Sequence, residues 1–123
     1  MKRFLAYLTL AFGLALLTLG LAAQSVLQPP INLSDPAQID AGKALFNGRC
    51  VAYCHGNEGS GGRTPAFKGN SSLKTEEVFR VITDGRSNAD VMPAYASTPE
   101  KERWQLVAYI MYLSRQPAAP SPQ

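Results

Sequence analysis

Residues 99–115 constrain the fold of this chain most, because they predict a helix that is apolar on nearly every side. Two sets of apolar residues each follow the i, i+3, i+4, i+7 spacing of a helix face: Leu106, Tyr109, Ile110 and Leu113 form one set, and Trp104, Val107, Ala108 and Met111 form the other. Such a helix must be buried on two sides. A chain of this size can hardly supply that much apolar surface from its own side chains. We therefore expect something other than side chains to complete the core.

Two earlier segments predict the remaining helices. Residues 36–47 begin with a proline at the first helical position and end at Gly48, which can supply a left-handed turn. Residues 75–84 begin at a threonine cap, carry two glutamates in the first turn and end at Gly85. No strand-like alternation of useful length occurs in the chain, so the predicted fold class is all-α.

The ends of the chain predict one folded domain between two unpacked segments. Residues 1–23 have a basic start, an uncharged apolar run over residues 4–21 and small residues after it, as is typical of an export signal. The run is just long enough to cross a bilayer, so cleavage and retention as a membrane tether both stay open. Residues 24–34 predict a linker, residues 35–116 the domain, and residues 117–123 a disordered Pro-rich tail. We expect a periplasmic protein, or one anchored to the outer face of the cytoplasmic membrane.

The positive charge of the chain lies largely in this predicted signal. The formal net charge of +3 falls to +1 if Lys2 and Arg3 are removed with it. No cationic patch with interleaved aromatic residues is present, which argues against a nucleic-acid partner. A nearly neutral domain would be steered only weakly by long-range charge.

Residues 50–55, Cys-Val-Ala-Tyr-Cys-His, contain both cysteines and the only histidine of the chain. The pattern Cys-x-x-Cys-His is typical of covalent attachment of c-type haem, in which the thiols add to the two vinyl groups and the histidine binds the iron. Here one further residue separates the cysteines. Because Cys54 and His55 remain adjacent, we expect the second thioether and the iron ligand to be preserved, while the thioether of Cys50 is the open question.

Two other roles remain open for these residues. Cys50 and Cys54 could form a simple disulfide in an exported protein, with His55 an incidental surface residue. The three side chains could also bind zinc or copper, although one histidine and two cysteines leave such a site short of ligands. A porphyrin between the helices would, in addition, give the third helix its second buried side.

Met92 is the candidate for the second axial ligand, because a thioether is the usual partner of histidine in electron-carrying haems. Met1 belongs to the predicted signal, and Met111 lies inside a predicted helix, where a methionine more often fills core space. The alternative is a loop methionine without a ligand role. With His55 and Met92 both bound to iron, no coordination position is left for a substrate, which favours an electron carrier over an enzyme.

From about residue 35 to residue 115 the chain resembles a class I cytochrome c domain. The matching parts, in order, are the spacing of Gly42 and Phe46, Cys54-His55-Gly56, the Gly-rich residues 59–65, residues 79–86, residues 91–95 and a last helix bearing Tyr109. The resemblance implies a cytochrome c fold with three main helices around one covalently bound haem c. It also implies that Gly42 and Phe46 lie where the first and last helices cross near Tyr109, and that the Pro65 carbonyl accepts a hydrogen bond from the His55 ring.

The expected function is the shuttling of single electrons between an exported or membrane-bound donor and a redox acceptor. The resemblance implies partners such as a respiratory complex, a terminal oxidase or an exported dehydrogenase, and it does not choose among them. A peroxidase-like haem enzyme or sensor with a dissociable Met92, and a haem-free disulfide module, are the alternatives. Four aromatic residues could line the haem edge or belong to the core: Phe67, Tyr95, Trp104 and Tyr109.

Overall fold

The computed structural model describes residues 27–88 and 91–118 of the 123-residue chain. The predicted signal at 1–23 and most of the predicted tail lie outside these residues. The described elements are α2 (Pro36–Arg49), the π-helical turn η2 (Val51–His55), the 3-10 turn η3 (Asn57–Gly59), α3 (Thr75–Asp84) and α4 (Glu100–Ser114). Across the described ranges no strand forms, only one isolated bridge between Arg86 and Met92. The all-α prediction is confirmed. No helix in residues 27–88 and 91–118 is long and apolar enough to cross a membrane.

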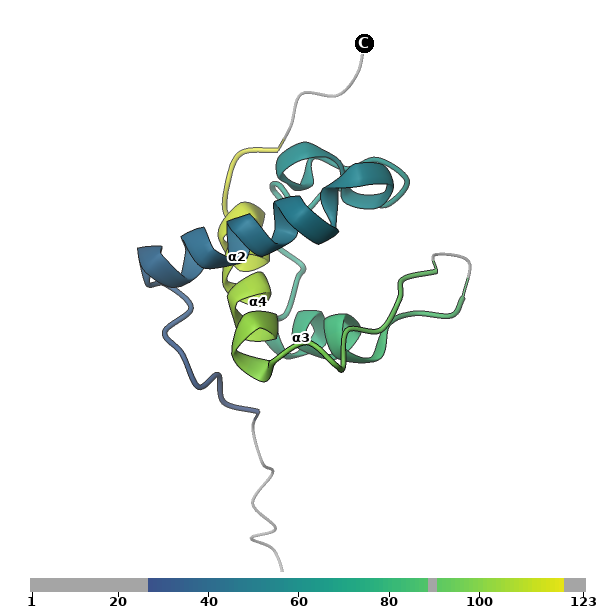
Figure 1. Ribbon diagram of the computed structural model, residues 1–123. Coiled ribbons are helices and arrows are strands. Elements are labelled where there is room, and N and C mark those ends of the chain that lie inside the picture. Colours follow the sequence, from purple (N-terminus) through teal and green to yellow (C-terminus); the bar gives the residue numbers. More distant parts are fainter. Residues whose placement is uncertain (1–26, 89–90, 119–123) are drawn as a thin grey trace, which may run out of the picture.

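Helix α4 forms the centre of the molecule, and α2 crosses over it while α3 packs beside it (Figure 1). A Cβ atom at Gly42 of α2 would overlap the backbone carbonyl of Gln105 and lie 3.0 Å from the Tyr109 Cβ atom. Phe46 is fully buried, and its ring meets the Tyr109 ring edge-on with 5.4 Å between centroids. The prediction that Gly42 and Phe46 lie at this helix crossing is confirmed.

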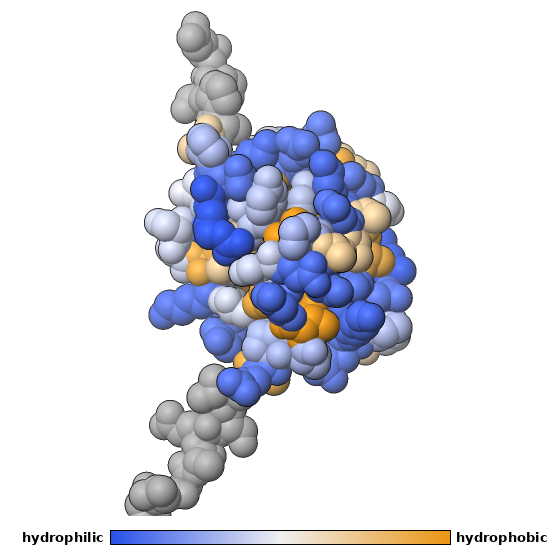
Figure 2. All heavy atoms as spheres, turned by 90° about the vertical axis from the view of Figure 1, so that its left-hand side faces the viewer, coloured by the Kyte–Doolittle hydropathy of each residue, from blue (hydrophilic) through white to orange (hydrophobic). Residues whose placement is uncertain are grey.

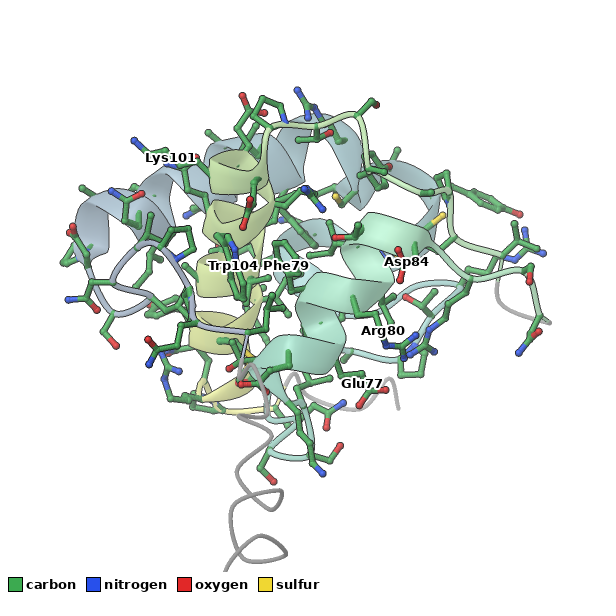
Figure 3. All side chains as sticks on the ribbon, turned by 90° about the horizontal axis from the view of Figure 1, so that it is seen from below. Glu77, Phe79, Arg80, Asp84, Lys101 and Trp104 are labelled. Atoms are coloured by element: carbon green, nitrogen blue, oxygen red, sulfur yellow. The ribbon has the colours of Figure 1, made fainter. Side chains whose placement is uncertain are left out.

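Both apolar faces of α4 are buried, as its sequence predicts. Its fully or nearly fully buried residues are Trp104, Leu106, Val107, Ala108, Tyr109, Ile110 and Leu113. Trp104 stacks on Phe79 of α3 with a centroid separation of 4.0 Å, and Figure 3 shows the two rings between the helices. Tyr109 of the first set therefore packs against Phe46 of α2, and Trp104 of the second set against Phe79 of α3. Leu106 and Ile110 of the first set line a cavity described below.

The helix ends correct some details of the sequence prediction. Helix α2 continues through Gly48 to Arg49, and the N–H of Cys50 still donates to the Phe46 carbonyl at 2.8 Å. Gly48 therefore supplies no left-handed turn, whereas Gly85, with φ 71°, ends α3 as predicted. Thr75 is the first residue of α3 rather than its cap, a place that the extended backbone of Lys74 takes.

The face of the molecule drawn in Figure 2 is mostly polar. Figure 2 shows a largely hydrophilic face interrupted by small, separate hydrophobic areas. Among the described residues, the exposed large hydrophobic side chains are Leu27, Tyr53, Val91 and Tyr112. Tyr53 lies in η2 and Val91 lies next to Met92, so two of the four flank the predicted site.

Candidate functional site

A cavity of about 470 Å³ lies between η2, α3, α4 and the loop that follows α3. All five residues predicted from the sequence line it: Cys50, Cys54, His55, Pro65 and Met92. Its apolar lining is Phe46, Phe67, Leu73, Val78, Val81, Ile82, Leu106 and Ile110. The cavity therefore collects residues from four separate parts of the chain, and its volume is within the usual range for cofactor sites.

The additional residue between the two cysteines is accommodated by a π-helical turn. The N–H of His55 donates to the Cys50 carbonyl at 3.3 Å, and the N–H of Gly56 donates to the Val51 carbonyl at 3.2 Å. These i→i+5 bonds enclose one residue more than an α-helical turn does. Cys50 and Cys54 consequently both remain at the cavity despite their longer spacing.

The ring of His55 is held between a hydroxyl group and two aromatic rings. The Thr64 Oγ1 atom lies 3.0 Å from the His55 Nδ1 atom. Phe67 stacks on the imidazole at 4.8 Å with 23° between the planes, and the Phe46 centroid lies 6.0 Å away. Burial lowers the pKa of His55, because it disfavours the charged ring. The neutral imidazole, the form that binds metals, is therefore the favoured one.

The structure gives His55 a different partner from the one that the sequence implied. The predicted acceptor was the Pro65 carbonyl, and Pro65 does line the cavity. The hydrogen bond recorded at Nδ1 is nevertheless with the hydroxyl group of Thr64, the preceding residue. A threonine inside a Gly-rich run gives no signal in the sequence that would have identified it.

Met92 reaches the cavity on a loop that folds back along α3. Its backbone exchanges two hydrogen bonds with Arg86, at 2.9 and 3.0 Å, and the N–H of Tyr95 donates to the Ile82 carbonyl at 3.0 Å. A Cβ atom at Gly85 would lie 2.8 Å from the Ala94 nitrogen, so glycine is needed where the loop passes the helix end. The position of Met92 is thus set by backbone contacts.

The thiol of Cys50 is in a different state from a metal-binding thiolate. Burial raises its pKa to about 11, so the thiol is protonated at neutral pH. Cys50 and Cys54 are both free. Within residues 27–88 and 91–118, no three His, Cys, Asp or Glu side chains are grouped as a metal site. Structural zinc sites usually have four such ligands, so the geometry does not favour zinc.

The four candidate aromatic residues divide into two pairs. Phe67 and Tyr95 line the cavity, and burial raises the pKa of Tyr95. Trp104 and Tyr109 do not line it and belong to the core, against Phe79 and Phe46 respectively. Helical spacing alone could not separate these roles, because the division depends on which neighbour each ring meets.

Residues 37–110, more than half of the chain, match a family model described as "Cytochrome C oxidase, cbb3-type, subunit III". The chain belongs to this family. Its members carry a cytochrome c domain, so the predicted cytochrome c fold, the binding of haem c and a function in electron transfer are confirmed at that level. Cytochrome c domains of this family are exported or membrane-associated. No curated protein and no solved structure matches the chain.

The cavity of this cytochrome c domain fits haem c. The apolar lining suits the porphyrin, and one imidazole and one thioether, those of His55 and Met92, are present as possible iron ligands. Polar and charged residues also line the cavity, among them the cations Arg49, Lys74 and Arg86. Arg49 is paired with Glu102 at 3.5 Å and Arg86 with Glu77 at 3.8 Å, so these two would share or exchange their partners to pair with a propionate carboxylate. The sequence gives no sign of this grouping, because the three cations lie far apart along the chain.

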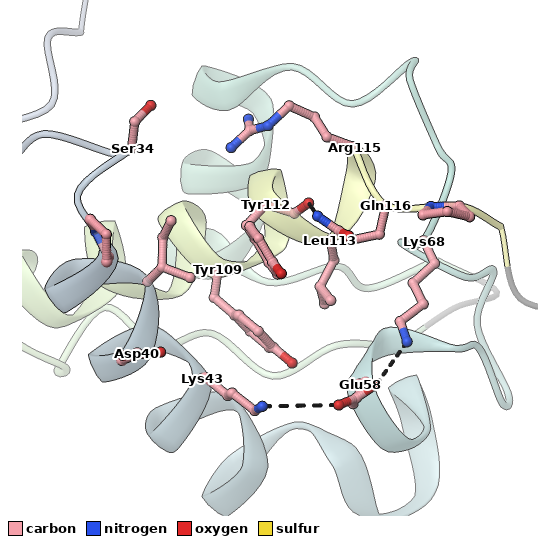
Figure 4. A pocket seen from close by; sticks show the side chains of 13 residues that line it. Ser34, Asp40, Lys43, Glu58, Lys68, Tyr109, Tyr112, Leu113, Arg115 and Gln116 are labelled. Carbon is pink, nitrogen blue, oxygen red and sulfur yellow. Dashed lines mark hydrogen bonds and ion pairs between the residues drawn. The ribbon is translucent and has the colours of Figure 1, made fainter.

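A second cavity of about 680 Å³ lies beside α2 and the end of α4 (Figure 4). Tyr109 contributes to its lining, and Glu58 forms ion pairs at 3.9 Å with Lys43 and 2.8 Å with Lys68. None of the predicted site residues lines it, and its lining includes neither a sulfur atom nor an imidazole. The chemistry of the lining, rather than the volume, therefore favours the smaller cavity as the candidate site for the predicted haem.

Proposed function

We propose that this protein shuttles single electrons through one haem c that is attached to Cys50 and Cys54 and ligated by His55 and Met92. The observation that supports this proposal is the cavity in which all four of these side chains meet. The bound haem supplies the ferric–ferrous couple that accepts and releases an electron. If His55 and Met92 both hold the iron, no coordination position would be left for a substrate, so the domain would be a carrier rather than an enzyme.

The residues around the cavity tune this couple. The thioether of Met92 favours ferrous iron, and the apolar lining excludes water and disfavours the extra charge of ferric iron. Both effects raise the reduction potential. Arg49, Lys74 and Arg86 would orient the cofactor by pairing with its carboxylates, and His55 and Met92 would hold the iron.

The place of the carrier is proposed from the N-terminal residues and from the family. Residues 1–23 direct export, and residues 24–34 link them to the domain at 35–116. Residues 4–21 serve as a tether if the signal is retained. The description of the family favours a terminal oxidase over the other partner classes, with an exported or membrane-bound protein as the electron donor.

Intact mass and an absorption spectrum of the protein, co-expressed with haem attachment machinery, test the proposal. We expect the mass of one haem and a spectrum of low-spin iron. In Cys50→Ala one vinyl group stays unsaturated, and its conjugation with the ring shifts the absorption bands to longer wavelength. Ser60→Ala, which changes an exposed residue nearby, is the control with an unchanged spectrum.

Two outcomes would contradict this function. A colourless product of the co-expression would end the haem proposal and favour a disulfide module. Rapid, tight binding of carbon monoxide to the reduced protein at neutral pH would show an open coordination position, and would favour a haem enzyme or sensor.

A further inference from the structure

We propose that Thr64 is a positioning residue that fixes the tautomer of His55 and thereby lowers the reduction potential of the haem iron. The proposal rests on the proposed function, in which the other ring nitrogen of His55 binds that iron. The geometry that carries it is the placement of a single hydroxyl group between the His55 ring and the Cys54 carbonyl.

The direction of both hydrogen bonds follows from counting donors. The Thr64 Oγ1 atom lies 3.0 Å from the Cys54 carbonyl oxygen and 3.0 Å from the His55 Nδ1 atom. A hydroxyl group has one hydrogen, and a carbonyl oxygen can only accept. The hydroxyl therefore donates to Cys54 and accepts at His55, so Nδ1 carries the proton. The Nε2 atom is left with its lone pair free for a metal.

The backbone holds this hydroxyl group in place. The N–H of Thr64 donates to the same Cys54 carbonyl at 3.1 Å, so Thr64 is bonded twice to the residue before His55. The Gly-rich run closes around it, with Gly61 N–H to the His55 carbonyl at 3.0 Å and Gly62 N–H to the Thr64 carbonyl at 3.1 Å. Little entropy remains to be lost when the His55 bond forms. Stacking on Phe67 further restrains the rotation of the His55 ring.

These two hydrogen bonds point in one direction, away from the His55 ring, and they increase the basicity of its other nitrogen. Each bond polarises the next from His55 Nδ1–H through the Thr64 hydroxyl to the Cys54 carbonyl. An acceptor at Nδ1–H makes the opposite nitrogen more basic. A more basic ligand stabilises ferric iron more than ferrous iron, because ferric iron carries the higher charge. Thr64 therefore lowers the reduction potential that Met92 and the apolar lining raise.

The test compares haem-loaded Thr64→Val, which keeps the shape of the side chain, with Thr64→Ser, which keeps the hydroxyl. In Thr64→Val we expect about a tenfold weaker preference for ferric iron. That change is a rise of ~59 mV in the potential of a one-electron couple. Thr64→Ser keeps the parent potential. Thr83→Val is the control, because the Thr83 hydroxyl also has two hydrogen-bond partners, Phe79 and Arg103, but does not line the cavity.

A second measurement reports the proton directly. In the reduced, diamagnetic protein with ¹⁵N-labelled histidine, we expect a slowly exchanging Nδ1–H signal in the parent and in Thr64→Ser, and fast exchange in Thr64→Val. Thr64→Ala, which also lacks the hydroxyl, serves for both measurements if Thr64→Val takes up no haem. An unchanged potential and an unchanged exchange rate in the variant without the hydroxyl would overturn the role of Thr64, as would Thr64→Ser behaving like Thr64→Val.

Failure of this inference is distinguishable from failure of the proposed function. A haem-containing parent whose potential is insensitive to Thr64 refutes the inference alone. A His55→Ala variant that retains the parent's low-spin spectrum refutes histidine ligation, and with it the function on which the inference rests.

Discussion

Met92 and Met111 show how the surroundings of a methionine decide its chemistry. Met111 lies within α4 and is half-buried against the core cluster, where its flexible side chain fills space. Met92 lies on a loop, lines the cavity and is held there through its backbone bonds to Arg86. A thioether that is fixed at the edge of an open cavity can reach an iron atom there, and one that fills a core cannot.

Substitution Met92→Ala therefore tests iron ligation at a single residue. We expect haem to stay attached while the reduction potential falls and the thioether-to-iron charge-transfer band at the red end of the spectrum disappears. Spectroelectrochemistry measures both. Met111→Leu, a volume-conserving change in α4, should leave the potential and the band as in the parent. Retention of both features in Met92→Ala would show that Met92 is not the ligand.

Two local features constrain the backbone around α2: the turn that follows it and its crossing with α4. The π-helical turn η2, which follows α2 directly after Cys50, absorbs the residue added between Cys50 and Cys54. At the crossing of α2 and α4, Gly42 lets the Gln105 carbonyl approach to a distance that no side chain would allow. The π-helical turn depends on one segment alone, whereas the close approach at Gly42 depends on the packing of two helices.

The helix crossing predicts opposite effects for two glycines of α2. Gly42→Ala must force the helices apart, and we expect a loss of about 1–3 kcal/mol in the free energy of unfolding. Gly48→Ala has no atom within 4 Å of the new Cβ and lies inside the helix, so we expect a gain of about 0.5–1 kcal/mol. Denaturant unfolding of the haem-loaded proteins measures both. The close crossing would be contradicted if Gly42→Ala lowered the free energy of unfolding no more than Gly48→Ala does.

At the scale of the molecule, helices α3 and α4 both give apolar residues to the lining of the proposed haem cavity: Val78 and Ile82 from α3, and Leu106 and Ile110 from α4. Without a bound group, these side chains would face an opening of about 470 Å³ and would lose the contacts that a filled core supplies. A small domain has only about 5–15 kcal/mol of net stability to offset such a loss. Cofactor and fold should therefore depend on each other.

The haem-free chain should accordingly be largely unstructured. A Cys50→Ser, Cys54→Ser variant, purified without haem, is expected to give a coil-like far-ultraviolet circular dichroism spectrum and no cooperative thermal transition. The haem-loaded parent, measured at the same concentration, provides the helical reference. Cooperative helical unfolding of the haem-free chain would show that side chains alone complete the core.

The sequence alone determined the all-α class, the bounds of α3 and the burial of α4, because these depend on periodicity and on the residues at helix ends. It also selected Cys50, Cys54, His55 and Met92, because few side chains in the chain have the required chemistry. Gly48 shows the limit of such local signals. A glycine that could have ended α2 stayed helical, because the helix runs on into η2.

Only the tertiary structure decided which side chains surround these residues. Thr64 at His55, the three cations at the cavity and the division of Phe67 from Trp104 all depend on contacts between distant segments. The type of a residue and its spacing from others determine the chemistry of its side chain, and both can be read directly from the sequence. Which neighbour it meets depends on how the helices and loops pack, and no local pattern in the chain specifies that.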